Sequence, residues 1–290
     1  MPTAPKRQPA SASAAQANCF AEAAAAERYR QARPYYHPLA MRWLTESAQR
    51  TGFAHALDAG CGAGHSSQAL AEVAAQVTGL DAAPEMLAQA EPHPRIVYQQ
   101  GSAEQLPFPP STFDLITVGA ALHWFDQPRF YRECRRVMAP GALLLVYNDH
   151  FTAHAPEVPE VKQWMRSSFA RRFPKPRRGM RDMDEPSALA AGFRLLRRGS
   201  FEHRVPYFRD EFIDFLLTRS NTLTALQKGR ETAASAAAWM DAELAPFVPA
   251  RQGDAAPTEF LFKCNLWLLA PPVEPSTERW DAPPAADTVK

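Results

Sequence analysis

The sequence predicts an α/β fold built on a doubly wound, mostly parallel sheet. Apolar strand-like segments alternate with helix-forming segments between residues 56 and 148, a pattern typical of parallel strands joined by crossover helices. The first strand runs into a turn with three glycines at alternate positions, and the second strand ends in Asp81. In such a sheet a ligand binds beyond the carboxyl ends of the strands, where the strand order reverses. We therefore expect the functional site beyond strands one and four.

The core elements follow in order along the chain. An alanine-rich helix is expected over residues 19–30 because alanine favours helix, and Pro34 and Pro38 separate it from a helix at 39–50 because proline interrupts helical hydrogen bonding. The expected strands lie at 56–59, 76–81, 95–99, 113–119 and 142–148. The helices between them are expected at 66–75, from Pro84 onward and at 128–138. Proline suits the first helical turn of the second of these.

Beyond Asn148 the regular alternation stops. We expect irregular or helical chain at 151–192, a strand with its flanks at 193–208, helix at 210–247 and a final strand at 259–269. The proline-rich tail after Pro271 and residues 1–18 have the composition of disordered chain,. The expected division is a disordered tail (1–18), a ligand-binding core with N-terminal lid helices (19–150), lid insertions with the last two strands (151–270) and a disordered tail (271–290).

Composition narrows the class of protein. Of the 290 residues 46% are apolar, and the formal net charge is +1. This is ample for one large packed domain, and the balanced charge argues against nucleic acid as a partner. The four cysteines form no Cys-x-x-Cys pair, so we expect free thiols in a reducing compartment and no metal site. Neither a membrane-spanning run nor the apolar centre of a signal peptide is present, so we expect a cytoplasmic protein.

The glycine turn, Leu57-Asp58-Ala59-Gly60-Cys61-Gly62-Ala63-Gly64, limits the choice of ligand. A dinucleotide site would need glycine at position 65, which is His65, and a phosphate loop would need a Gly-Lys-Ser/Thr sequence. Asp58 disfavours phosphate but suits an ammonium group, and a carboxylate placed like Asp81 binds ribose hydroxyls. A nucleoside with a charged amino-acid tail, S-adenosylmethionine, meets both conditions. The alternative is a tight turn without a ligand.

Further segments carry a resemblance to a known family. They are Gly101-Ser102-Ala103-Glu104-Gln105-Leu106-Pro107-Phe108, Phe113-Asp114-Leu115-Ile116 and Met138-Ala139-Pro140-Gly141-Ala142. With the glycine turn they resemble class I S-adenosylmethionine-dependent methyltransferases of the small-molecule, type 11 branch. The segments 121–126 and 29–36 are similar to the trans-aconitate methyltransferase-like subgroup. The resemblance implies a Rossmann-like seven-stranded sheet, an antiparallel edge hairpin formed by the last two strands, and a helical lid over the substrate.

The resemblance also implies the cofactor contacts. The glycine turn should border the methionine portion, with Asp58 near the ammonium group, and Asp81 should accept from the ribose hydroxyls. Ser102 stands where many relatives carry aspartate, and Met86 has the alternative of ordinary helix core. The full set of expected cofactor-binding residues is Asp58, Gly60, Cys61, Gly62, Gly64, Asp81, Ala82, Met86, Ser102, Ala103, Glu104, Gly119 and Ala120.

The segment His123-Trp124-Phe125 follows the fourth strand, where a side chain can face both the sulfonium and the acceptor. His123 is the candidate catalytic residue, as a general base or as an orienting hydrogen-bond partner for the accepting oxygen. A purely structural role is the alternative, with the histidine bonded to a loop carbonyl beside a packed tryptophan. The expected substrate contacts are Tyr29, Arg33, Tyr36, His123, Trp124 and Phe125.

Two basic features bear on the substrate. Arg33, in the N-terminal lid segment, could bind a carboxylate of cofactor or substrate bidentately, or form a surface ion pair. Residues 161–181 hold eight basic side chains and no acidic one. Such a run is either a solvated face or a docking face for an anionic partner, for instance a carrier-protein phosphopantetheine or a polycarboxylate.

The predicted function is S-adenosylmethionine-dependent O-methylation of a small organic molecule, a reaction that would suit secondary metabolism. A carboxylate acceptor, which gives a methyl ester, is favoured over a hydroxyl, and a carrier-bound acyl substrate is an alternative. A non-catalytic S-adenosylmethionine-binding protein is one rival class. A nucleotide-dependent oxidoreductase is another, and the glycine spacing and Asp58 count against it.

Overall fold

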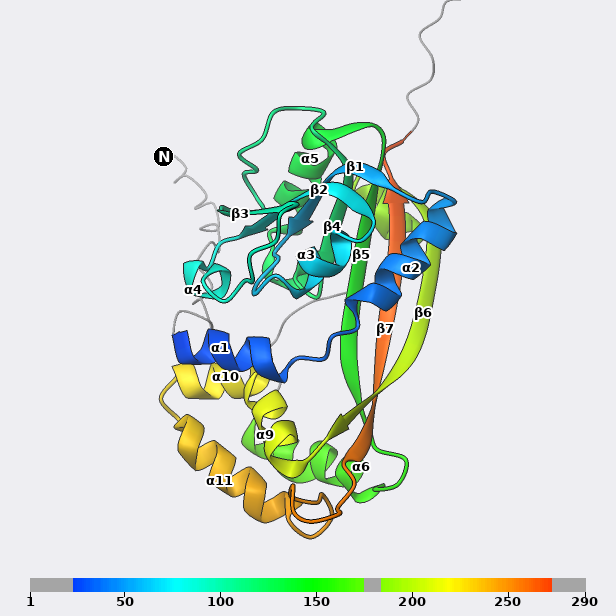
Figure 1. The fold of residues 1–290 in the computed structure, drawn as a ribbon. Helices are drawn as coiled ribbons and strands as arrows, with labels where there is room; N and C mark the ends of the chain where they lie inside the picture. The colour runs from blue at the N-terminus through cyan, green and yellow to red at the C-terminus, as the bar shows by residue number, and fades with distance from the viewer. Residues whose placement is uncertain (1–22, 175–183, 273–290) are drawn as a thin grey trace, which may run out of the picture.

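The computed structural model describes residues 23–174 and 184–272 (Figure 1). These residues form a seven-stranded sheet in the order β3-β2-β1-β4-β5-β7-β6. The strands are β1 (Phe53–Ala59), β2 (Ala74–Asp81), β3 (Ile96–Gln100), β4 (Phe113–Gly119), β5 (Met138–His154), β6 (Arg194–Tyr207) and β7 (Thr258–Ala270). The first five strands are parallel, and β7 is antiparallel to both β5 and β6. The predicted Rossmann-like sheet with an antiparallel edge pair is confirmed.

Helices cover both faces of the parallel part of the sheet. On one face Met41 and Leu44 of α2 pack with Leu70 of α3 against the strands, and on the other face Phe130 of α5 packs beside Phe193. The helices of this part are α1 (Ala23–Ala32), α2 (His37–Ala48), α3 (His65–Leu70), α4 (Pro84–Leu87), η1 (Leu122–Trp124), α5 (Gln127–Val137) and α8 (Glu185–Ala190). Two buried apolar layers therefore enclose the sheet.

Two expected boundaries differ from the structure. The helix expected at 66–75 ends at Leu70, because β2 starts at Ala74, which pairs with Phe53 of β1. The helix expected at 39–50 starts at His37, with Pro38 inside its first turn, where a missing N–H costs no helical hydrogen bond.

Three strands extend well beyond the parallel part of the sheet. Figure 1 shows β5, β7 and β6 continuing as a long twisted ribbon toward a group of helices, which we call the lid helices. They are α6 (Glu160–Trp164), η2 (Met165–Phe169), α7 (Ala170–Arg172), α9 (Arg209–Leu217), α10 (Ser220–Gln227) and α11 (Ala233–Leu244). The expectation of irregular or helical chain from residue 151 is wrong for residues 151–154, which continue β5. Phe151 there joins the apolar cluster of the lid helices.

The N-terminal helix α1 joins the parallel part of the sheet to the lid helices. Ala26 packs with Met86 of α4, and Arg28 forms an ion pair with Asp214 of α9 at 3.3 Å. The expected disorder of residues 1–18 falls outside the described residues, as do Cys19 and nearly all of the tail after Pro271. The other three cysteines are free and buried.

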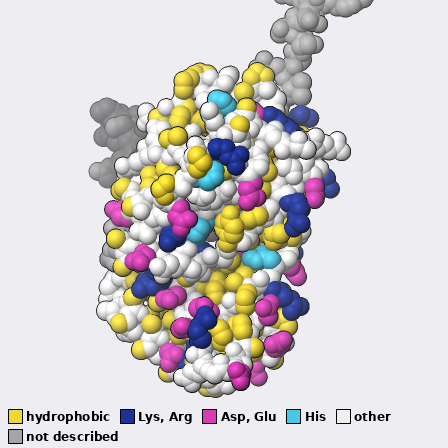
Figure 2. All heavy atoms as spheres, in the orientation of Figure 1, with side chains coloured by type: hydrophobic (Ala, Val, Ile, Leu, Met, Phe, Trp, Pro, Cys, Tyr) yellow, Lys and Arg dark blue, Asp and Glu magenta, His cyan; other side chains and the backbone are white. Residues whose placement is uncertain are grey.

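None of the helices within 23–174 and 184–272 is long and apolar enough to cross a membrane. Figure 2 shows one face of the molecule, where basic and acidic side chains are interspersed. Within the basic stretch, Lys162, Arg166 and Arg171 are exposed, whereas Arg172 is paired with Glu231 at 2.7 Å. Lys175, Arg177, Arg178 and Arg181 lie outside the described residues.

Candidate functional site

A cavity of about 450 Å³ lies at the carboxyl ends of β1, β2 and β4, where the sequence predicted the site. Its wall continues along β5 to the lid helices, and α1 contributes Tyr29 to it. One cavity therefore joins the glycine turn to the lid helices. Of the expected contacts, its lining includes Tyr29, Arg33, Gly60, Gly62, Asp81, Ala82, Met86, Ala103, Glu104, Gly119, Ala120, His123, Trp124 and Phe125.

The glycine turn is required by the protein's own packing. Gly60 and Gly62 have φ angles of +74° and +54°, which a side chain strongly disfavours. A Cβ on Gly60 would also lie 2.6 Å from the Cβ of Ala121. Gly64, with φ of +83°, packs against the hydroxyl of Tyr98 and does not line the cavity. The absence of a side chain at Gly64 thus lets Tyr98 approach the backbone closely.

Asp58 lies beneath the cavity and outside its lining. The carboxylate is fully buried and accepts hydrogen bonds from Ser66 Oγ at 2.5 Å, Ser67 Oγ at 2.7 Å and Thr117 Oγ1 at 3.0 Å. Burial raises the pKa of Asp58, and the three hydroxyl donors oppose that shift. This carboxylate therefore holds β1, α3 and β4 together, and its expected contact with an ammonium group stays a prediction.

Asp81 connects the end of β2 to the glycine turn and lines the cavity. Its Oδ2 accepts from the backbone N–H of Gly62 at 2.8 Å, and its Oδ1 accepts from that of Ala83 at 2.9 Å. Burial raises the pKa of the carboxyl group, while these amide donors lower it. Each oxygen keeps a further lone pair, so Asp81 can still accept from a diol.

The loop after β3 places Ala103 and Glu104 in the cavity wall but turns Ser102 away from it. Ser102 is exposed and hydrogen-bonds the Glu104 carboxylate, and its Oγ accepts from the Glu104 N–H at 3.1 Å. Glu104 Oε1 also accepts from the Asp126 N–H at 2.9 Å. The Ser102 hydroxyl is thus engaged by its own loop, and its expected contact with adenine stays a prediction.

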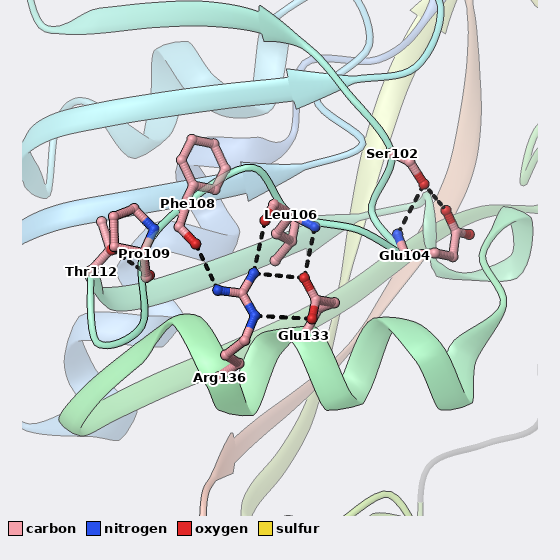
Figure 3. A network of polar contacts seen from close by, with 8 residues as sticks. All are labelled: Ser102, Glu104, Leu106, Phe108, Pro109, Thr112, Glu133 and Arg136. Atoms are coloured by element: carbon pink, nitrogen blue, oxygen red, sulfur yellow. Dashed lines mark hydrogen bonds and ion pairs between the residues drawn. The ribbon is translucent and has the colours of Figure 1, made fainter.

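A charged pair on α5 fixes the next part of this loop (Figure 3). Arg136 donates to the carbonyl oxygens of Phe108 at 2.7 Å and Leu106 at 2.8 Å, and to Glu133 at 2.7 and 3.0 Å. Glu133 in turn accepts from the Leu106 N–H at 2.9 Å. These charge-assisted contacts hold residues 106–108 against α5. The loop that borders the cavity is therefore held in position by α5, which packs on one face of the sheet.

The end of β4 and the residues after it supply the part of the cavity wall beside the glycine turn. Gly119 leads into Ala120, which has φ of +52°, and then into η1. His123, Trp124 and Phe125 all line the cavity, and the rings of His123 and Trp124 lie 5.2 Å apart. The short helix thus brings all three predicted side chains to the cavity.

The N-terminal segment divides between the cavity and a smaller hollow beside it. Arg33 lines both, lies 4.8 Å from the Tyr29 ring centroid, and donates to the Thr218 carbonyl at 2.8 Å. Among the described residues Arg33 forms no ion pair, so the expectation of a surface ion pair finds no support there. Tyr36 and Cys61 line only the smaller hollow. Tyr36 therefore does not line the main cavity, and its expected contact with a substrate stays a prediction.

Behind that hollow lies a buried row of aromatic and imidazole rings. The His37 ring stacks on Tyr36 at 4.3 Å between centroids, and its Nδ1 lies 2.9 Å from the hydroxyl of Tyr147. Burial, with smaller contributions from the charges of His65 and His203, lowers the pKa of His37 to about 3. His37 is therefore a neutral structural group at physiological pH.

Sequence reasoning missed the residues that β5, β7 and the lid helices contribute. They are Asn148, Asp149, His150, Phe151, Phe215, Thr218, Arg219, Ser220, Leu223 and Phe262. Asp149 Oδ1 lies 2.9 Å from His203 Nε2 on β6. The polar run at 148–150 follows the end of the predicted fifth strand, a position at which ligands bind in such sheets. That signal could have found Asp149 and His150, but no motif marks the lid residues.

Comparison with known proteins agrees with this geometry. Residues 57–146 match a family model described as a methyltransferase domain. An uncharacterized methyltransferase of Mycobacterium tuberculosis is 37% identical over 122 residues, which are 41% of this chain and 49% of that protein. A malonyl-[acyl-carrier protein] O-methyltransferase of Pectobacterium atrosepticum is 40% identical over 90 residues, covering 30% of this chain and 36% of that protein. A solved structure from Anaeromyxobacter dehalogenans, described as a type II methyltransferase, superposes with a TM-score of 0.62 at 29% identity, covering 81% of this chain and 97% of that chain.

The fold, the cavity and these matches define a class I S-adenosylmethionine-dependent methyltransferase domain, with S-adenosylmethionine as its cofactor. The family match extends from β1 into β5 and stops before the lid helices. The chain spans about half the length of the first curated relatives it matches. The class thus rests on the cofactor-binding part, and the family match does not cover the lid helices.

Proposed function

We propose that this protein transfers the methyl group of S-adenosylmethionine to an oxygen of a small organic molecule, and that a carboxylate is the favoured acceptor. The observation that carries the proposal is the continuity of the cavity, which runs from Asp81 to Arg219 without a dividing wall of described residues. A cofactor at the sheet end and an acceptor at the lid end would share one enclosed space. The proposed resemblance to the trans-aconitate methyltransferase-like subgroup supports the carboxylate.

The cofactor end has the groups that S-adenosylmethionine requires. Asp81 would accept from the ribose hydroxyls, each charge-assisted hydrogen bond contributing roughly 1.5–3 kcal/mol. Ala103 and Glu104 would border the adenine, with Met86 on one face. The Nε of Arg33 is buried without an acceptor, which suits the carboxylate of the methionine portion or of the acceptor. When bound, the cofactor supplies an already activated sulfonium methyl group.

The chain's own contribution to the reaction is alignment in a dry cavity. Holding an acceptor oxygen in line with the sulfonium methyl replaces a bimolecular encounter by a fixed geometry. A carboxylate acceptor is ionised at neutral pH and needs no base, so His123 would then orient it. For a hydroxyl acceptor, His123 would take the proton. Trp124 and Phe125 beside it would exclude water.

A carrier-bound acyl substrate is the second candidate function. The exposed Lys162, Arg166 and Arg171 lie on the lid segment, and basic side chains suit the phosphate of a phosphopantetheine arm. The relative from Pectobacterium atrosepticum acts, by its name, on an acyl-carrier-protein substrate. A non-catalytic binding protein would need no open cavity between Tyr36, His123 and the lid helices. The cavity that joins His123 to the lid helices supports an enzyme, although Tyr36 does not line it.

The test is mass spectrometry of products formed from S-adenosylmethionine and a panel of small acids and phenols. We expect products heavier by one methylene unit, with methyl esters predominating over ethers. His123→Ala should leave ester formation within about tenfold but reduce ether formation by about 10²–10⁴-fold. His55→Ala, on an exposed residue of β1, is the matched control. Cofactor binding without any methylated product would support the non-catalytic alternative.

A further inference from the structure

Two arginines face the lid end of the cavity. Arg33 follows α1, and Arg219 precedes α10 as its N-cap residue. Both guanidinium carbons lie over the ring of Phe215, at 5.4 and 5.8 Å from its centroid. Arg219 also lies 5.9 Å from the ring centroid of Phe151. Aromatic rings from α9 and β5 thus hold two cations beside one another.

These two cations lack a negative partner among the described residues. The Nε atoms of Arg33 and Arg219 are both enclosed and have no hydrogen-bond acceptor. Burial, together with the positive charge of Arg33, lowers the pKa of Arg219 to about 10, so the group is still protonated at neutral pH. An enclosed guanidinium without a counter-charge is unfavourable. A ligand that brings a carboxylate would remove this cost.

The acidic residues of the cavity are engaged elsewhere. Asp81 accepts from backbone amides at the glycine turn, Glu104 accepts from the amide that precedes α5, and Asp149 lies against His203. None of the three is within ion-pair distance of Arg33 or Arg219 in the described structure. The lid end of the cavity is therefore positively charged and the sheet end is negatively charged.

We propose that Arg219, with Arg33 beside it, binds a carboxylate of the acceptor, so that the substrates are small carboxylic acids with an apolar body. The inference rests on the proposed methyltransferase function and deepens it. Planar guanidinium groups bind carboxylates bidentately, and the N-terminal turn of α10 adds its free N–H groups. Phe151, Phe262 and Leu223 line the same end of the cavity and would enclose the hydrocarbon part.

The position of Arg219 separates the acceptor from the cofactor. Arg33 also borders the smaller hollow at the glycine turn, whereas Arg219 borders only the main cavity, next to Ser220 and Leu223 of α10. Arg33 can therefore reach toward either ligand. Arg219 is on the lid side, and its loss should affect the acceptor alone.

The test measures binding to the full chain saturated with S-adenosylhomocysteine, so that no turnover is needed. Benzoate and hexanoate are titrated against benzamide and hexanamide, with tryptophan fluorescence or saturation-transfer NMR as the readout. We expect the acids to bind better than the amides. Arg219→Met should weaken acid binding by about tenfold or more, because a charge-assisted contact is lost, with amide and S-adenosylhomocysteine affinities changed less than about twofold. Arg197→Met, on an exposed residue of β6, should change none of them.

Three outcomes would overturn the inference. Acids could bind Arg219→Met as well as the unaltered protein, or S-adenosylhomocysteine affinity could fall in parallel with acid affinity, which would assign Arg219 to the cofactor. If neither benzoate nor hexanoate bound the unaltered protein, the inference would also be overturned. Circular dichroism checks that the variant is folded. If acids bind through Arg219 yet no methyl transfer occurs, the proposed function fails while this binding site stands.

Discussion

Thr117 of β4 donates a hydrogen bond from Oγ1 to Oδ1 of Asp58 on β1, over 3.0 Å and fully shielded from solvent. The other oxygen of the same carboxylate accepts from two serine hydroxyls of α3. One carboxylate thus joins three elements below the cavity floor. Because Asp58 joins these elements, we expect its substitution to lower the stability of the fold more than the affinity for a ligand.

Asp58→Ala is therefore expected to lower the free energy of unfolding by about 2–4 kcal/mol, because three hydroxyl groups lose their buried partner. Asp58→Asn keeps the shape and should retain S-adenosylmethionine affinity within about tenfold. Urea denaturation and calorimetric titration measure the two effects. If Asp58→Asn left stability unchanged but abolished cofactor binding, the carboxylate would have to contact the ammonium group after all.

Gly60→Ala tests the steric requirement of the turn. The new Cβ would lie 2.6 Å from the Cβ of Ala121 and would occupy a φ of +74°. Overpacking typically costs about 1–3 kcal/mol, and the left-handed conformation adds about 1 kcal/mol. Gly141→Ala is the matched control, because its φ is +75° and nothing lies within 4 Å of the added carbon. We expect only Gly60→Ala to weaken cofactor binding as well, and equal losses of stability in the two variants would refute the packing argument.

Arg136→Ala should loosen the loop that carries Ala103 and Glu104. Its guanidinium holds two loop carbonyls and Glu133, and its removal leaves the two carbonyls without this donor and Glu133 with only the Leu106 N–H. The expected loss is about 1–3 kcal/mol of stability and a several-fold weaker affinity for S-adenosylmethionine. Hydrogen exchange at residues 102–112 should rise. Arg132→Ala, on the exposed side of the same helix, is the control and should show neither effect.

Acidification should destabilise the protein through His37. The pKa of this buried imidazole is about 3 in the folded chain, whereas an unfolded histidine titrates near 6.5. Between these values the unfolded state binds more protons, so stability is fully present above about pH 6.5 and falls as the pH is lowered. The slope from one such proton is about 1.4 kcal/mol per pH unit. The pKa of His65 is lowered in the same direction.

His37→Gln should remove part of that slope, and His55→Gln, at an exposed position, should not. Urea denaturation at several pH values between 7 and 4 gives the comparison. Identical slopes for the unaltered protein and His37→Gln would show that the acid sensitivity arises elsewhere.

The parallel sheet was predictable because its signals are local. Each strand of the core is an apolar run bounded by a turn, and three glycines with positive φ (Gly60, Gly62 and Gly64) occupy the first turn. Boundaries were less certain, since the start of β2 depends on the pairing of Ala74 with Phe53. The residues between the two strands do not indicate which residues of the strands pair with each other.

The site was predictable where a strand end carries a polar residue, and not elsewhere. Asp81 and His123 were found from their positions after strands two and four. Ser102 does not line the cavity, and its side chain instead hydrogen-bonds Glu104, a local choice that composition does not reveal. Arg219 was missed because only the packing of α9 and α10 against the ribbon brings it to the cavity.

The last pair of the β6–β7 ladder joins Tyr207 to Thr258. The chain between them, which includes α9, α10 and α11, therefore leaves the sheet and returns to it at a single point. This segment could be exchanged for another without altering the pairing of β6 with β7. The exchange would change the walls at the lid end of the cavity. Under the proposed function, replacing this one continuous stretch of chain would change the acceptor preference, while the pairing of the sheet strands stays as it is.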